Sequence, residues 1–268
     1  MKWLSFVALL LSVSAASAGA QWVVPPSTNW LKQGDFDRPR PAHHRAGIRP
    51  LSVPHSAIPN WPFPNIDVTN SPAFGQFEPS VAINPTDSND IIIGYIDDSS
   101  FSTLAYSATT DGGITWSRKL LPQRTDVAFN GATDPSVAFE PQGSALFALG
   151  FYDGASVNNA VGLFQSTDLG NDWMPRADAF ENVSGDTISD KFYIAVDRSA
   201  SSRFSGRIYI SWVDQGEPGY VRIVCAYSSD QGQSWSVRRY LSGLGHYTAP
   251  VPVTEPDGTL LVAYVDYY

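Results

Sequence analysis

The chain has 268 residues, a formal net charge of −9 at pH 7 and a single cysteine, Cys225. The acidic balance excludes the basic surface that nucleic acids and anionic membranes require, and one cysteine cannot form an intramolecular disulfide or a cysteine-based metal cluster. The 21 glycines, 20 prolines and 13% aromatic residues favour many short strands joined by turns over long helices.

The first 20 residues predict a signal peptide. A positively charged start is followed by an apolar run over residues 3–13, and the small residues Ala18 and Ala20 provide a cleavage signature before Gln21. The apolar run is shorter than a membrane span, and no later segment of the sequence is long enough for one. We therefore expect an exported protein, which is extracellular or, in a bacterium, periplasmic.

Residues 21–72 predict a proline-rich leader. Its ten prolines recur without any hydrophobic period, which excludes a long helix or a central strand. We expect an extended segment that drapes over a later domain or stays mobile. The adjacent His43 and His44 have no obvious third partner, so they are weak grounds for a metal site.

After residue 72 the sequence repeats itself. The segment Glu78–Pro85 returns as Asp134–Pro141, 56 positions further on, and looser copies begin at Asp190 and Ala249. Each copy is followed by an apolar strand that ends in aromatic-x-Asp, and these ends are Asp97, Asp153, Asp214 and Asp266. A repeat of this length, built from short strands and turns, is typical of a β-propeller in which each repeat is one four-stranded blade.

A second motif, hydroxyl-x-Asp-x-Gly-x-x-Trp, has a fixed place in each full repeat. Its defining residues are Asp111, Gly113 and Trp116, then Asp168, Gly170 and Trp173, then Asp230, Gly232 and Trp235. The carboxylate can accept backbone N–H bonds within a tight turn, and the glycine can adopt the positive φ that such a turn needs. The tryptophan offers a large face for packing against a neighbouring sheet. These residues are therefore expected to be structural.

The three octets resemble the Asp-box, or BNR repeat, of the sialidase (neuraminidase) superfamily, and the resemblance covers residues 73–268. It implies an all-β fold, a β-propeller of four-stranded antiparallel blades that is usually six-bladed in sialidases. It also implies that the Asp-box lies between the third and fourth strands of a blade. The chain would then supply about three and a half blades of a ring, with blades at 73–128, 129–184 and 185–245 and a partial blade at 246–268.

The meander topology predicts where a site lies. The starts of the innermost strands and the ends of the second strands lie at the end of the blades opposite the Asp-boxes. Carboxylates that converge there could bind sugar hydroxyls or a cation, or act as an acid–base pair. The candidate catalytic residues are Asp97 and Asp134, and the candidate binding residues are Glu78, Asp153, Asp190, Asp214, Glu217 and Tyr220. The structural alternative is that these carboxylates only accept backbone N–H bonds.

One residue that the resemblance implies is missing. Sialidases carry a Phe/Tyr-Arg-Ile-Pro motif whose arginine helps to grip the sugar carboxylate, and aligning its proline with Pro79 puts Phe77 at the arginine position. The equivalent places in later repeats are aligned with Thr133, Ser189 and Thr248. An acidic face without that arginine favours neutral glycans over sialic acid.

Two functions are compatible with these observations. The chain is either a sialidase-like glycoside hydrolase or a non-catalytic extracellular propeller that binds a glycan or protein partner, and the sequence leaves open which. We expect a glycan or glycoconjugate as partner, no nucleic acid and no membrane span. No cofactor is predicted, with a structural or site Ca²⁺ as the alternative.

Overall fold

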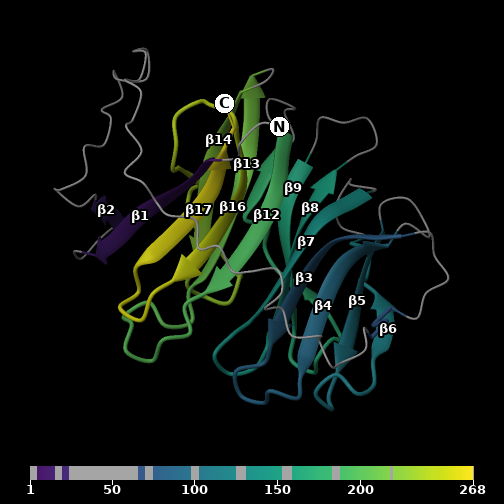
Figure 1. Ribbon diagram of the computed structural model, residues 1–268. Coiled ribbons are helices and arrows are strands. Elements are labelled where there is room, and N and C mark those ends of the chain that lie inside the picture. Colours follow the sequence, from purple (N-terminus) through teal and green to yellow (C-terminus); the bar gives the residue numbers. More distant parts are fainter. Residues whose placement is uncertain are drawn as a thin grey trace, which may run out of the picture.

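The computed structural model describes residues 5–15, 20–23, 66–69, 75–97, 103–124, 131–152, 159–182, 188–217 and 220–267. In this part of the chain the regular structure is all strand, arranged as four antiparallel sheets that fan out around a common axis (Figure 1). No helix long and apolar enough to cross a membrane occurs among these residues. The predicted all-β propeller architecture is confirmed.

The first three sheets are meanders, which we number as blades 1 to 3. From the axis outward, blade 1 holds β3 (Gln76–Ile83), β4 (Ile91–Asp97), β5 (Thr103–Thr109) and β6 (Ser117–Leu120). Blade 2 holds β7 (Gly131–Phe139), β8 (Ala145–Tyr152), β9 (Asn159–Ser166) and β10 (Met174–Pro175), with β11 (Phe180–Asn182) also paired to β9. Blade 3 holds β12 (Ile188–Val196), β13 (Ile208–Glu217), β14 (Tyr220–Ser228) and β15 (Arg239–Tyr240).

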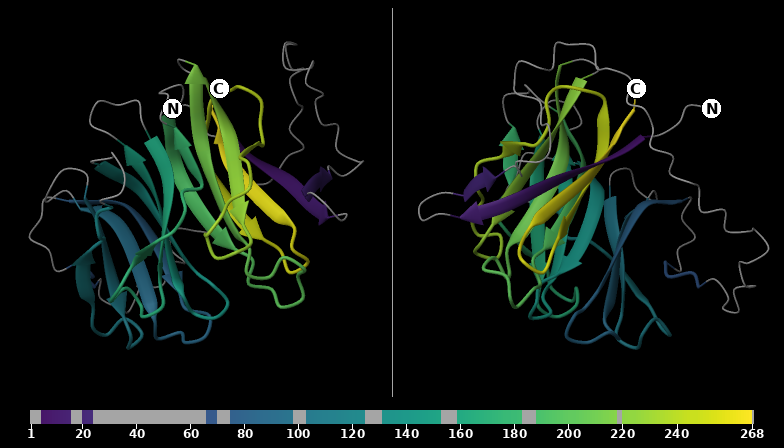
Figure 2. Two further views of the ribbon diagram at one scale, coloured as in Figure 1. Left: turned by 180° about the vertical axis from the view of Figure 1, so that it is seen from behind. Right: turned by 60° about the vertical axis from the view of Figure 1, so that its left-hand side comes forward.

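Blade 4 combines strands from opposite ends of the sequence. It contains β16 (Tyr247–Thr254) and β17 (Leu260–Asp266), followed outward by β1 (Ser5–Ala15) and β2 (Ala20–Val23) (Figure 2). β1 runs antiparallel to β17, from Ser5 opposite Asp266 to Leu11 opposite Leu260. The segment predicted as a signal peptide thus occupies the third position of the blade, whereas the sequence predicted only two strands here. Its cleavage stays a prediction, and most of the proline-rich leader lies outside the described residues.

The apolar cores lie between blades rather than within them. One cluster joins blades 1 and 2, a second joins blades 2 and 3, and a third joins blades 3 and 4. β8 shows why its sequence is apolar almost throughout: Phe147 and Leu149 face the first cluster, while Leu146 and Ala148 face the second. A strand between two neighbouring blades is buried on both faces, so alternating polar residues are not tolerated.

The Asp-box turns lie between the third and fourth strands of blades 1 to 3 and share one hydrogen-bond pattern. In blade 2 the Ser166 hydroxyl donates to Asp168 Oδ1 at 2.8 Å and accepts the Gly170 N–H at 2.7 Å. Asp168 Oδ1 also accepts the Asp172 N–H at 2.9 Å. Gly170 has a φ of 89°, which a residue with a Cβ rarely adopts. The same bonds recur around Asp111 and Asp230.

A β-bulge interrupts each of the four inner strands at the same place. The bulged residue has a left-handed backbone, with φ between 49° and 56°, at Glu78, Asp134, Lys191 and Ala249. The sequence alignment of the third repeat was therefore wrong by one position. The equivalent of Asp134 is Lys191 rather than Asp190, because the bulge and not the chemical type fixes the register.

The Pro-Ser pair that follows the bulge in blades 1 and 2 also has a physical role. The Ser80 hydroxyl accepts the N–H of Val137 in the next inner strand at 3.0 Å, and the Ser136 hydroxyl accepts that of Ile194 at 3.1 Å. Each serine therefore ties its blade to the following one near the axis.

Replacing Trp173 by alanine should lower the free energy of unfolding by about 3–5 kcal/mol. Trp173 is 8% exposed and packs edge-on against Tyr106 of blade 1 and Phe147 of blade 2, with ring centroids 5.5 and 5.8 Å apart. Urea denaturation measures the loss. Trp116→Ala is the matched control, because Trp116 has the same Asp-box position but is only partly buried. It should cost roughly 1–2 kcal/mol, and equal losses would contradict the proposed packing.

Candidate functional site

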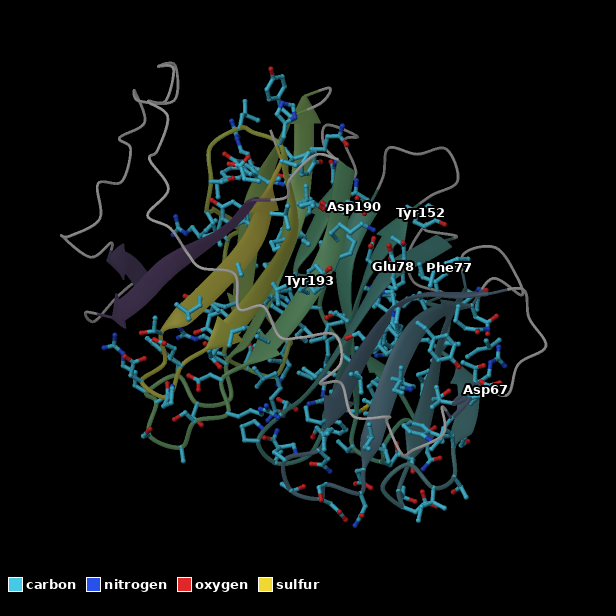
Figure 3. All side chains as sticks on the ribbon, in the orientation of Figure 1. Asp67, Phe77, Glu78, Tyr152, Asp190 and Tyr193 are labelled. Carbon is cyan, nitrogen blue, oxygen red and sulfur yellow. The ribbon has the colours of Figure 1, made fainter. Side chains whose placement is uncertain are left out.

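The bulges bring three carboxylates and one ammonium together at the end of the inner strands opposite the Asp-box turns. Lys191 Nζ lies 2.5 Å from Glu78 Oε1, 2.8 Å from Asp134 Oδ1 and 3.8 Å from Asp190 Oδ1. Figure 3 shows Glu78 and Asp190 at this end of the inner strands. We call these four residues, contributed by blades 1 to 3, the axial cluster.

The members of the axial cluster differ in depth. The Asp134 side chain is 4% exposed, whereas that of Asp190 is 53% exposed to solvent. Asp134 Oδ1 accepts the Lys191 bond, but the buried Oδ2 has no N–H or hydroxyl donor among the described residues. The neighbouring carboxyl groups of Glu78 and Asp190 can bond to the Asp134 carboxylate only if one of them carries a proton.

The titration of the carboxyl groups follows from this arrangement. Burial and the hydrogen bond with Asp134 raise the pKa of Glu78. Burial opposes the charge of Asp134, but hydrogen bonds from Glu78 and Lys191 outweigh it and lower the pKa of Asp134. Burial and the negative charge of Asp134 raise the pKa of Asp190 to about 6. Half of the Asp190 side chain is exposed, which limits desolvation and leaves repulsion by Asp134 as the main cause.

The Lys191 side chain is a cation at neutral pH. Burial disfavours its ammonium, but the hydrogen bonds to Asp134 and Glu78 outweigh that cost and raise the pKa of Lys191. One ammonium faces three carboxyl groups, so the carboxyl groups outnumber the positive charges in the axial cluster.

Two of the predicted site residues lie elsewhere. Asp97 is completely buried and bonds to Arg118 within blade 1, and Asp214 is 3% exposed and bonds to Arg238 within blade 3 at 2.9 Å. Both aspartates lie at the predicted end of the blades, opposite Gln76 and Ser189 at the start of the inner strands, but neither is part of the axial cluster. The aspartates that end the second strands instead pair with an arginine from the outer part of the same blade. The catalytic assignment of Asp97 gains no support from this geometry.

The other predicted site residues, Asp153, Glu217 and Tyr220, are not part of the axial cluster. Asp153 lies outside the described residues, and Glu217 is described only as the last residue of β13. Tyr220 is 46% exposed at the start of β14, where its ring contacts His246. No group of three or more histidine, cysteine, aspartate or glutamate side chains in the described part of the chain could hold a metal ion, so the Ca²⁺ alternative has no described site.

Sequence reasoning missed Lys191, the residue that joins the cluster. The signal was present, because the third repeat matched the first two only loosely and placed a lysine beside the aligned aspartate. The corrected register also puts Asp190, not Ser189, at the position compared with the sialidase arginine. Phe77, which holds that position in blade 1, is 52% exposed.

Sequence comparison finds no matching family model and no matching curated protein. Solved structures do match. The α-L-arabinanase of Penicillium chrysogenum, in complex with arabinobiose, gives a TM-score of 0.54 at 14% identity over 68% of this chain and 54% of its own. The GH93 α-L-arabinofuranosidase of Fusarium graminearum gives 0.51 at 11% identity over 66% and 52%. A Trypanosoma rangeli sialidase mutant gives 0.48 at 15% identity over 72% and 36%.

These likenesses establish the fold. The chain has a β-propeller fold, and the all-β propeller that the Asp-box octets predicted is confirmed. The chain spans about half the length of the two arabinan-related structures.

Replacing Lys191 by methionine should lower the free energy of unfolding by roughly 2 kcal/mol, because buried Asp134 then loses its cation. We expect less than the about 3–5 kcal/mol typical of a fully buried pair, since a third of Lys191 is exposed. Urea denaturation of K191M, D134N and the double variant measures the coupling. Lys119→Met, which removes an exposed bond to Asn171, is the control and should change stability by less than about 0.5 kcal/mol. Equal losses in K191M and K119M would refute the buried ion pair.

Asp190→Asn should raise the melting temperature relative to wild type more at pH 7 than at pH 5. The folded pKa of Asp190, about 6, lies above its unfolded value, so the native state binds the proton more tightly and wild-type stability falls as pH rises from about 4 to 6. Asparagine removes this dependence. Asp257→Asn is the contrasting control, because the Thr259 N–H lowers the pKa of Asp257 and its loss should not stabilise the fold at pH 7. A D190N difference that is larger at pH 5 would contradict the repulsion from Asp134.

Proposed function

We propose that this chain is a secreted glycoside hydrolase that acts on neutral glycans at the axial cluster. The observation that carries the proposal is the convergence of Glu78, Asp134 and Asp190 from three blades around one lysine. Ligand sites place a few convergent polar groups on a largely pre-formed, apolar framework. Export rests on the predicted signal peptide over residues 1–20.

The chemistry follows from carboxyl groups whose pKa values are driven apart. Asp190, with a pKa raised to about 6 and an exposed side chain, suits a group that gives a proton to a leaving sugar oxygen in weakly acidic solution. Asp134, whose pKa is lowered, stays ionised and can stabilise the positive charge that develops on the sugar ring. Water then adds to the anomeric carbon and gives its proton to the Asp190 carboxylate, which restores the acid. We therefore assign the acid role to Asp190 and the charge-stabilising role to Asp134.

The charge of the cluster selects the sugar. Three carboxyl groups surround one ammonium, and Phe77 holds the place where the sialidase resemblance implies an arginine. An anionic sugar would meet net negative potential without a bidentate cation, whereas neutral hydroxyls can donate hydrogen bonds to the carboxylates. The arabinobiose bound to the matched arabinanase is consistent with a neutral substrate and supplies a starting probe.

A non-catalytic function has one observation in its favour. The Lys191 bonds to Glu78 and Asp134 form a polar network within the protein that needs no ligand to neutralise the buried charge. A propeller whose axial cluster only ties blades together could still bind a glycan or a protein through its loops. Binding without turnover would support this alternative.

Activity against a substrate panel tests the proposal. Debranched arabinan, β-mannan and a fluorogenic sialoside are incubated with the 268-residue chain between pH 4 and 8, and released sugar is measured. We expect turnover of a neutral glycan, none of the sialoside, and a loss of about 10²–10⁴-fold in kcat for Asp190→Asn. Asp172→Asn, an exposed change at the Asp-box end, should retain activity. Sialoside turnover that survives D134N and D190N would overturn both the substrate class and the assigned residues.

A further inference from the structure

A row of aromatic side chains lies at the same end of the blades as the axial cluster but on blades 3 and 4. Tyr220 starts β14, His246 precedes β16, and Tyr267 follows β17. The His246 ring lies 5.0 Å from that of Tyr220 and 6.3 Å from that of Tyr267, measured between centroids, with interplanar angles of 34° and 44°. Both tyrosines are almost half exposed, at 46% and 47%.

Backbone hydrogen bonds fix the three segments that carry these rings. Val221, next to Tyr220, exchanges two hydrogen bonds with Gly245, at 2.9 and 3.0 Å. The Tyr267 N–H donates to the His246 carbonyl at 3.0 Å. The rings therefore extend from chain segments held in register with one another, which limits the conformational entropy lost when a ligand covers them.

The core between the strands that carry the row is packed. Tyr247 and Tyr264 are both buried and meet edge-on, with ring centroids 5.2 Å apart, in the core between blades 3 and 4. A Cβ at position 245 would lie 2.4 Å from the Tyr247 ring, so glycine is required for this packing. The strands β16 and β17 next to the row are thus anchored in a packed core.

We propose that Tyr220, His246 and Tyr267 form a stacking platform for additional sugar units of an extended neutral glycan whose cleaved or recognised end lies at the axial cluster. The C–H face of a sugar ring packs against a half-exposed aromatic face, while tyrosine hydroxyls remain free to meet sugar hydroxyls and water. Neither tyrosine brings a carboxylate, ammonium or guanidinium group to the platform, which suits a neutral glycan. This inference rests on the function proposed above and adds that the ligand is a polymer longer than a disaccharide.

The test compares a polymer with its own disaccharide. Calorimetry measures the Kd of debranched arabinan and of arabinobiose, and in parallel of β-mannan and mannobiose, for the wild-type chain, for Tyr220→Ala with Tyr267→Ala, and for Tyr240→Ala. Tyr240 is the matched control, because it is also 47% exposed but lies on the outer strand β15 beneath Arg222. Melting curves confirm that each variant is folded.

We expect the paired tyrosine variant to weaken polymer binding about tenfold while disaccharide binding changes less than about twofold, and Y240A to match wild type. Equal polymer affinity in the paired variant and wild type would overturn the platform and leave the proposed function standing. Failure of the wild-type chain to bind any of the four probes would overturn both. Specific binding of a protein at the stacking platform, with no glycan binding, would also overturn the proposal and identify a protein interface instead.

Discussion

The ammonium of Lys191 is the interaction on which the candidate site depends. At a separation of 4 Å and an effective dielectric constant of 20, two unscreened carboxylates repel each other by about 4 kcal/mol. Glu78, Asp134 and Asp190 can share one end of the axis because the ammonium of Lys191 offsets that repulsion. The same lysine links side chains of blade 3 to those of blades 1 and 2, so the chemistry of the site and the assembly of the blades are coupled.

The two ends of the blades have different physical roles. At one end, the Asp-box turns satisfy their own backbone donors and place a tryptophan such as Trp173 in the apolar layer between blades. At the other end, inner strands leave regular geometry at the bulges and expose polar groups. Buried ion pairs such as Asp97 with Arg118 have a third role, because they neutralise a charge inside a blade without exposing it to a ligand.

Much of the fold could be predicted from the sequence, because its signals are periodic and local. The recurrence of Asp-Gly-Trp positions and of strands ending in aspartate reports hairpin turns and blade length directly. The membership of the axial cluster could not be derived in the same way. Lys191 and Asp190 are adjacent in sequence, and only the bulge decides which of them has the left-handed backbone and faces Asp134. The burial of Asp97 likewise depends on Arg118, a residue that the sequence motifs did not single out.

The left-handed residue of each inner strand has a consequence for how such a protein can diversify. Its backbone geometry is set by the bulge and persists whether the side chain is that of Glu78, Asp134, Lys191 or Ala249, although a left-handed non-glycine residue costs about 1–2 kcal/mol. Since the ladder hydrogen bonds of the strand do not involve that side chain, the four positions keep one backbone geometry while their side chains differ in charge, and only Lys191 also links its blade to two others. The four bulges therefore give the inner strands a set of equivalent positions around the axis, each with its own side-chain chemistry.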